Sequence, residues 1–233
     1  MASPQKLSAQ AAAAWAGSFM AAFPEPVVAR LLVGAREAVV PAGALFYRGA
    51  HREETVKVGL VVSGLLRTFR RSPDGRQVTL RYAYESSVIG LPTALGHDAA
   101  VDSEALVSSR VVILDPHTFR TVAAGEALVA WAVAVYLAGV VAEAGEMLSA
   151  DLFLPVRGRV ARHLLDMALH DGGRLVVRAS QQDLADAIGS VREVVARAVR
   201  GLIAAGYLER RGRDLVIRDP AALHRVSLGD ETL

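Results

Sequence analysis

The sequence of 233 residues predicts an α+β fold in three parts, namely an antiparallel β-roll of the jelly-roll type, a long helix and a C-terminal winged helix-turn-helix. Three observations predict it. Short strand-like runs punctuated by Gly, Pro and Asp fill residues 39–114, a helical pattern covers 119–150, and two further helical patterns flank Gly189. We therefore divide the chain into an N-terminal helical extension (1–22), the β-roll (23–118), the long helix (119–152) and the winged helix-turn-helix (153–229).

The predicted β-roll rests on several short strands at close spacing, which is typical of antiparallel barrels and jelly rolls. Asp74-Gly75, within 72–76, lies between two such runs and is a strong hairpin signal. Asp115-Pro116 ends the last strand. The strand-like segments are VVPAGALFYRG, KVGLVVSGLLRTFRR, QVTLRYAYE and ALVSSRVVILD.

Residues 127–142 form an uncharged, apolar run of sixteen residues. A membrane helix needs about 20 strongly apolar residues, so we predict burial in a subunit interface instead. Side chains at alternating steps of four and three residues have the spacing of a coiled-coil seam. Glu143 on this seam either faces the partner subunit's Glu143, which would make dimerisation pH-sensitive, or leans toward solvent or a β-roll arginine. The predicted homodimer seam is Val129, Val133, Tyr136, Val140, Glu143 and Met147.

Residues 180–218 have the pattern of a winged helix-turn-helix. Ser180 is the predicted N-cap of the first helix, with Asp183 three residues later, and Gly189 ends that helix. Ser190 is the predicted N-cap of a second helix over 190–205, and the basic hairpin around Asp214 forms the wing. A helix over 156–170 and a strand over 175–178 precede this motif. The second helix, which can enter the major groove of DNA, leaves four charged residues outside its apolar face: Arg192, Glu193, Arg197 and Arg200.

The positive charge is concentrated in the C-terminal part. Residues 155–225 hold 13 Arg against 8 Asp and Glu, a net charge of +5, whereas the rest of the chain has a net charge of −3. This asymmetry is expected if the C-terminal part meets phosphate. The chain has no cysteine, which excludes disulfides, thiolate zinc sites and cysteine-ligated iron–sulfur clusters within it. The Ala-rich residues 11–22 predict a short helix rather than an export signal, and we expect a cytoplasmic protein.

The order of these parts, together with QQDLADAIGSVREVVARAVRGL, resembles the Crp–Fnr family of bacterial transcription regulators. The residues that match the family motif are Asp183, Leu184, Ala185, Gly189, Arg192, Glu193 and Arg197. The resemblance implies a cyclic-nucleotide-binding-like β-roll and a homodimer on palindromic double-stranded DNA, with RNA polymerase as a partner if the protein activates. It implies base contacts from Arg192, Glu193 and Arg197, and phosphate contacts from Ser180 and Gln182, with Arg200, Arg210, Arg211 and Arg213 as further candidates. The alternative for the first three is a solvated, ion-paired helix face.

Two features depart from better-known family members. Val191 and Val194 stand where Ser or Thr is frequent, so Val194 can offer a methyl contact to thymine but no hydrogen bond to phosphate. Leu91 stands where cyclic-AMP-binding members have Glu, Ser103 or Glu104 stands near the Arg position, and no Arg occurs between residues 81 and 110. We therefore expect no cyclic-nucleotide binding in the usual mode, since a buried phosphate needs a cation.

The effector and other functions stay open at this stage. A candidate effector pocket comprises Gly90, Leu91, His97 and Ser103, and haem on His97, a small metabolite or no ligand at all are the alternatives. We predict no metal site and no resident cofactor. A cupin-like β-roll enzyme is a remote alternative, because the β region has no His-X-His pair. A membrane-anchored regulator using residues 127–142 is another.

Overall fold

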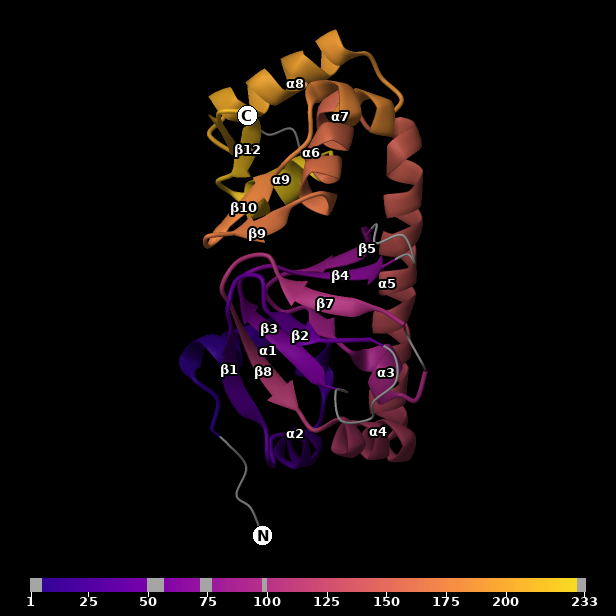
Figure 1. Cartoon of the computed structure of the whole chain (residues 1–233). Helices are drawn as coiled ribbons and strands as arrows, with labels where there is room; N and C mark the ends of the chain where they lie inside the picture. The colour runs from indigo at the N-terminus through magenta and orange to yellow at the C-terminus, as the bar shows by residue number, and fades with distance from the viewer. Residues whose placement is uncertain (1–5, 50–56, 72–76, 98–99, 230–233) are drawn as a thin grey trace. The chain divides into compact units, whose positions relative to one another are not determined.

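The computed structural model describes residues 6–49, 57–71, 77–97 and 100–229 (Figure 1). The chain forms two compact units, an N-terminal unit (Met1–Ala142) and a C-terminal unit (Glu143–Leu233). The boundary therefore falls inside a helix, not at residue 153, because the first half of that helix packs within the N-terminal unit.

The N-terminal unit contains two four-stranded sheets, with strand orders β1-β8-β3-β6 and β2-β7-β4-β5. All their pairings are antiparallel, which confirms the predicted β-roll. The hairpin signal at 72–76 lies outside the described residues, although β4 and β5 on either side of it pair with each other. The strands are β1 (Arg36–Val40), β2 (Leu45–Tyr47), β3 (Val58–Ser63), β4 (Leu66–Arg71), β5 (Gln77–Ala83), β6 (Val88–Ile89), β7 (Asp102–Ala105) and β8 (Ser109–Leu114).

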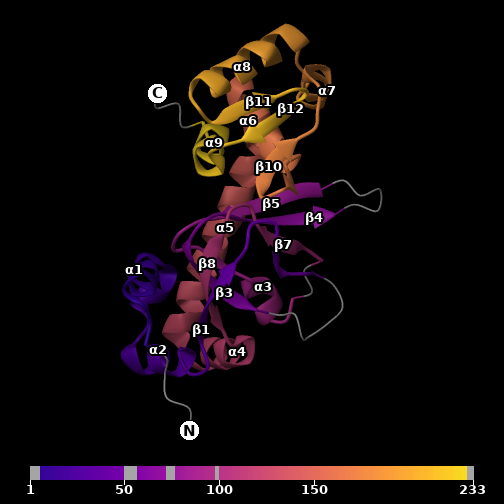
Figure 2. The ribbon, with the colours of Figure 1, turned by 60° about the vertical axis from the view of Figure 1, so that its left-hand side comes forward.

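Strand β3 shows why its sequence is apolar on both faces. Val58, Leu60 and Val62 pack with the helices, whereas Val61 packs with Leu66 of the facing sheet. Helix α1 lies beside β3 (Figure 2). Both faces of the strand are therefore buried, so the alternation that marks a half-exposed strand is absent.

The N-terminal residues are part of this core rather than an extension of it. Trp15 and Met20 belong to the same buried cluster as Leu60 of β3 and Val129 of the long helix. Ser18 ends the first helix, and its Oγ accepts a hydrogen bond from the Met20 backbone N–H. The first three helical elements are α1 (Ala9–Gly17), the 3₁₀ helix η1 (Phe19–Ala22) and α2 (Glu25–Leu31).

The predicted continuous helix from residue 119 is divided in two. Helix α4 (Pro116–Gly125) begins with Asp115 as its N-cap, and α5 (Ala127–Phe153) follows after Glu126, whose backbone is extended at φ −121° and ψ 105°. The helical pattern on both sides hides this break, because one residue changes the chain direction without a Pro at that point. A short helix, α3 (Leu91–Ala94), lies between β6 and β7.

The C-terminal unit contains a four-stranded antiparallel sheet of order β11-β12-β10-β9, with helices around it (Figure 1). The helix predicted over 156–170 ends at Asp166, and Leu169–Asp171 instead forms β9, paired with β10 around the Gly172-Gly173 turn. The elements are α6 (Val156–Asp166), β9 (Leu169–Asp171), β10 (Arg174–Val177), α7 (Gln181–Ala187), α8 (Arg192–Ala204), β11 (Leu208–Arg211), β12 (Asp214–Ile217) and α9 (Pro220–Ser227).

Candidate nucleic-acid interface

The start of α7 is fixed by two reciprocal hydrogen bonds. The Asp183 backbone N–H donates to Ser180 Oγ at 3.1 Å, and the Ser180 backbone N–H donates to Asp183 Oδ2 at 2.8 Å. These bonds satisfy amide groups that a helix start otherwise leaves without partners. They also lower the pKa of the Asp183 carboxyl, first through the Ser180 backbone bond and then through its hydroxyl. The predicted cap at Ser180 is confirmed.

The turn between α7 and α8 is tight. Gly189 has a positive φ of 61°, and the Ser190 backbone N–H reaches back to the Ala185 carbonyl at 2.9 Å, as in a glycine-terminated helix. Arg159 of α6 donates from Nη1 to the Ile188 carbonyl at 2.7 Å, which holds the end of α7. This geometry sets the angle at which α8 leaves the turn.

Helix α8 begins two residues later than predicted. Its N-cap is Val191, which supplies no side-chain cap, so the prediction that Ser190 caps this helix is wrong. The Ser190 backbone N–H is instead used to close α7. Val195, Val199 and Leu202 bury the inner face of α8. The four charged residues predicted outside the core are all exposed: Arg192, Glu193, Arg197 and Arg200.

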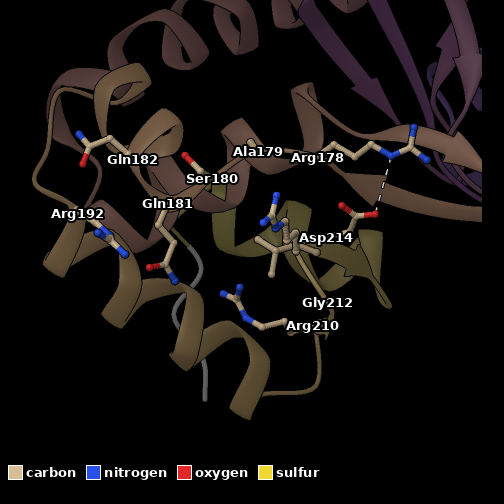
Figure 3. A pocket seen from close by; sticks show the side chains of 11 residues that line it. Arg178, Ala179, Ser180, Gln181, Gln182, Arg192, Arg210, Gly212 and Asp214 are labelled. Atoms are coloured by element: carbon tan, nitrogen blue, oxygen red, sulfur yellow. Dashed lines mark ion pairs between the residues drawn. The ribbon is translucent and has the colours of Figure 1, made fainter.

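A hollow of about 620 Å³ lies between the start of α7, the start of α8 and the wing. Gln181, Arg192 and Arg210 come from these three places and project toward the same space (Figure 3). Asp214 on its edge lies 3.9 Å from Arg178. The hollow therefore presents four arginines and two glutamines together with the apolar parts of its lining residues. Its lining residues are Arg178, Ala179, Ser180, Gln181, Gln182, Arg192, Arg210, Gly212, Arg213, Asp214 and Leu215.

The three wing arginines do not share one side of the wing. Arg210 and Arg213 line the hollow, whereas Arg211 lines a separate one with Arg174 and Asp171. Arg211 Nε also donates to Glu209 at 2.6 Å, and this bond lowers the pKa of the Glu209 carboxyl. The alternation of side chains along β11 explains the split, because neighbours in a strand face opposite sides.

Arg178 and Gln181 line the hollow with polar side chains but were not among the site residues predicted from the sequence. Arg178 directly follows β10 and forms ion pairs with Asp171 and Asp214, and Gln181 is the first residue of α7. Arg178 lies two residues before the Ser180 cap and within the positively charged segment 155–225. Including the residues just before the cap among the candidates would therefore have found it. No sequence signal separates Gln181 from Gln182.

The predicted dimer seam is only partly open. Val129 and Val133 are buried in the core of the N-terminal unit, and the Tyr136 hydroxyl contacts the Val88 backbone N and O, both at 2.8 Å. Val129 and Val133 are therefore covered by their own chain, so a dimer seam cannot run through these two valines. Val140 is half-buried and Glu143 is exposed, whereas the Met147 side chain lies outside the described part.

A different stripe of α5 is open. In an all-apolar helix several stripes have the same spacing, and contacts inside the N-terminal unit decide which of them is covered. Residues 127–145 also form a helix apolar and long enough to cross a membrane, with little of it buried. The exposed stripe, at steps of three and four residues, is Leu128, Trp131, Val135, Ala138 and Ala142.

The candidate effector-pocket residues lie in different settings. Leu91 is 1% exposed and packs in the apolar core, and His97 is exposed. Gly90 adopts φ +85°, and a Cβ there would lie 1.9 Å from the Lys57 carbonyl oxygen. Ser103 is buried on β7, and its Oγ has no hydrogen-bond partner. Within the described ranges no group of three or more His, Asp or Glu side chains could hold a metal ion.

Comparison with known proteins assigns the chain to a family. A model described as the Crp-like helix-turn-helix domain matches residues 158–226. The transcriptional regulator LdrP of Thermus thermophilus is 30% identical over 188 residues, which cover 78% of this chain and 91% of that protein. The chain belongs to the Crp–Fnr family.

Other relatives of this Crp–Fnr protein agree with that assignment. A CRP-like cAMP-activated global transcriptional regulator of Mycobacterium tuberculosis is 26% identical over 183 residues, covering 76% of this chain and 82% of the relative. A crystal structure of a crp/fnr-family regulator from Eubacterium rectale shares the fold, with a TM-score of 0.58 and 20% identity, covering 88% of this chain and 95% of the other. The Crp–Fnr protein is thus a DNA-binding transcription regulator.

Proposed function

We propose that this Crp–Fnr regulator binds a palindromic DNA site as a homodimer, with α8 of each protomer in the major groove. The observation that carries the proposal is the cationic hollow between α7, α8 and the wing. A duplex lying across it would bring base edges to the exposed side of α8 and phosphates to the surrounding arginines.

Base reading is assigned to Arg192, Glu193 and Arg197. Arg192 and Glu193 are the first two residues of α8, and Arg197 lies one turn beyond Glu193 on the same exposed side. Arginine can pair bidentately with the O6 and N7 of guanine, and glutamate can accept from the N4 of cytosine. The three side chains therefore suit a short G·C-containing half-site.

Phosphate contacts are assigned to residues that line the hollow and to Arg200 on the exposed side of α8. Ser180 Oγ accepts from the Asp183 backbone N–H, and its hydroxyl, which also bonds to the Asp183 carboxylate, would turn to donate to a phosphate oxygen. Arg211 leaves the predicted set because it faces Glu209 on the other side of the wing. The assigned contacts are Ser180, Gln182, Arg200, Arg210 and Arg213, and we add Gln181 and Arg178 because they line the same hollow.

The homodimer is assigned to the exposed stripe of α5. Leu128 is 51%, Trp131 69% and Val135 54% exposed. Large apolar side chains at this spacing are the pattern of a two-stranded coiled coil, and such a contact would cover surface that water otherwise meets. A cytoplasmic dimer accounts for the apolar run without a membrane.

Cyclic AMP is not assigned as the effector, although one relative is described as cAMP-activated. Leu91 stands where cyclic-AMP-binding family members have Glu, and it is buried among apolar side chains. We expect cyclic AMP at about 1 mM, roughly 10³ times a micromolar Kd, to change neither the melting temperature of the protein nor its affinity for DNA. Calorimetry and fluorescence anisotropy would measure these two quantities.

Selection of duplexes from a random pool by the purified protein, at a stated salt concentration, tests the proposal. Enrichment of a palindrome with half-sites about one helical turn apart is the expected result. Arg192→Ala and Arg197→Ala should each relax one base position per half-site. A site without two-fold symmetry, or variants that keep every base preference, would overturn the proposal.

A further inference from the structure

We propose that Val191 is a specificity-determining residue that reads the 5-methyl group of a thymine in the operator. The inference rests on the proposed function, since it requires α8 in the major groove. It assigns a base-reading role to a side chain outside the charged set already described.

Val191 is a solvent-exposed apolar side chain at the N-terminal end of α8, the end that the proposed function places against DNA. It is 58% exposed and directly precedes Arg192, which lines the cationic hollow. Among the described residues from 180 to 205, no other large apolar side chain is comparably exposed. Val194, three residues later, is half-buried.

Helix stability does not explain a valine at this position. Val191 is the N-cap of α8 and makes no side-chain cap bond. Ser, Thr, Asp and Asn are strongly preferred there because their oxygens accept from the first helical amides. The same chain uses such a cap at Ser180 of α7. A valine at this position lowers helix stability and exposes apolar surface. A favourable contact outside the helix, with a bound partner, would offset this cost.

The chemistry of the major groove supplies such a contact. The distinctive apolar group on its floor is the C5-methyl of thymine, and small aliphatic side chains contact it. A valine facing a phosphate would desolvate an anion without offering a hydrogen bond. Val191 next to Arg192 therefore suits a thymine beside the base that Arg192 reads.

The experiment replaces single thymines of the selected operator by deoxyuridine, which removes only the methyl group, and measures the Kd of the full-length protein by fluorescence anisotropy. We expect one thymine per half-site at which the wild type binds about fourfold more weakly, the factor for burying roughly one methyl-sized group. Val191→Ser should bind the thymine and uracil duplexes equally. Its melting temperature should not fall, because serine can cap α8.

Val39→Ser is the matched control, since Val39 is a similarly exposed valine (62%) on β1. It should keep the fourfold discrimination. The inference is overturned if the wild type ignores uracil at every thymine, or if Val191→Ser still discriminates, while palindrome selection still succeeds. Failure of the selection itself overturns the proposed function instead.

Discussion

The Ser180 hydroxyl illustrates how one side chain can serve both the fold and the proposed interface. Its oxygen accepts a hydrogen bond from the Asp183 backbone N–H, and the residue also lines the hollow. Ser180→Ala should lower the free energy of unfolding by about 1 kcal/mol, as for a lost N-cap, and should also weaken DNA binding. Urea unfolding and anisotropy titrations would measure the two effects. Ser190→Ala is the control, and an equal loss there would contradict the cap assignment.

His224 gives a prediction about pH. Burial, and next the charge of Arg225, lower the pKa of His224 in α9 from 6.5 to about 4. Between pH 6.5 and about 4, His224 is therefore protonated in the unfolded chain but not in the folded chain. Stability is full above pH 6.5 and falls as the pH drops toward 4, by up to about 3 kcal/mol.

Unfolding experiments with His224→Gln would test this pH dependence. The variant should lose the part of the acid-induced decline between pH 6.5 and 4 that His224 causes, whatever its stability at pH 8. His97→Gln, at an exposed position, should decline as the wild type does. An unchanged slope in the His224 variant would show that another group causes the decline.

At the scale of elements, the wing separates two kinds of arginine. Arg210 lines the hollow, whereas Arg211 is bonded to Glu209 on the other side. Each phosphate contact adds about 0.9 to the slope of log K against log salt, so Arg210→Ala should reduce the slope of a homodimer by about 2. Arg211→Ala should leave it nearly unchanged. Titrations at several salt concentrations measure both slopes, and equal reductions would contradict the split.

Element boundaries show where sequence patterns stop being informative. The Ser180–Asp183 cap, Gly189 and the wing could be predicted because each depends on local backbone chemistry. Ser190 could not, because whether its amide closes α7 depends on the turn geometry. Likewise β9 continues a helical pattern, and only its pairing with β10 across Gly172-Gly173 makes it a strand.

At the scale of the whole molecule, the order of β-roll, long helix and winged helix-turn-helix could be predicted because their periodicities differ. The faces of α5 could not. Residues 127–142 are apolar all round, so the pattern does not say which stripe meets the β-roll. Val129 is buried and Trp131 exposed only because of contacts with distant segments such as α1 and β3.

A prediction about the dimer follows from the exposure of Trp131 on α5. Trp131→Glu places a charge on the exposed stripe of α5, where a close copy of the helix would carry the same charge. We expect sedimentation to show a dimer for the wild type and a monomer for this variant. Binding to the palindrome should weaken at least tenfold, whereas binding to an isolated half-site should change little, because each protomer keeps its own α8.

Val39→Glu adds the same charge at an exposed valine of β1 and should stay dimeric. If the Trp131→Glu variant remains dimeric and keeps its affinity for the palindrome, the dimer interface does not include this stripe. Circular dichroism distinguishes dissociation from unfolding, since Trp131 makes no contribution to the buried core and the variant should keep its helices. Comparing the two variants thus shows whether dissociation depends on a charge at the α5 stripe or on an added surface charge anywhere.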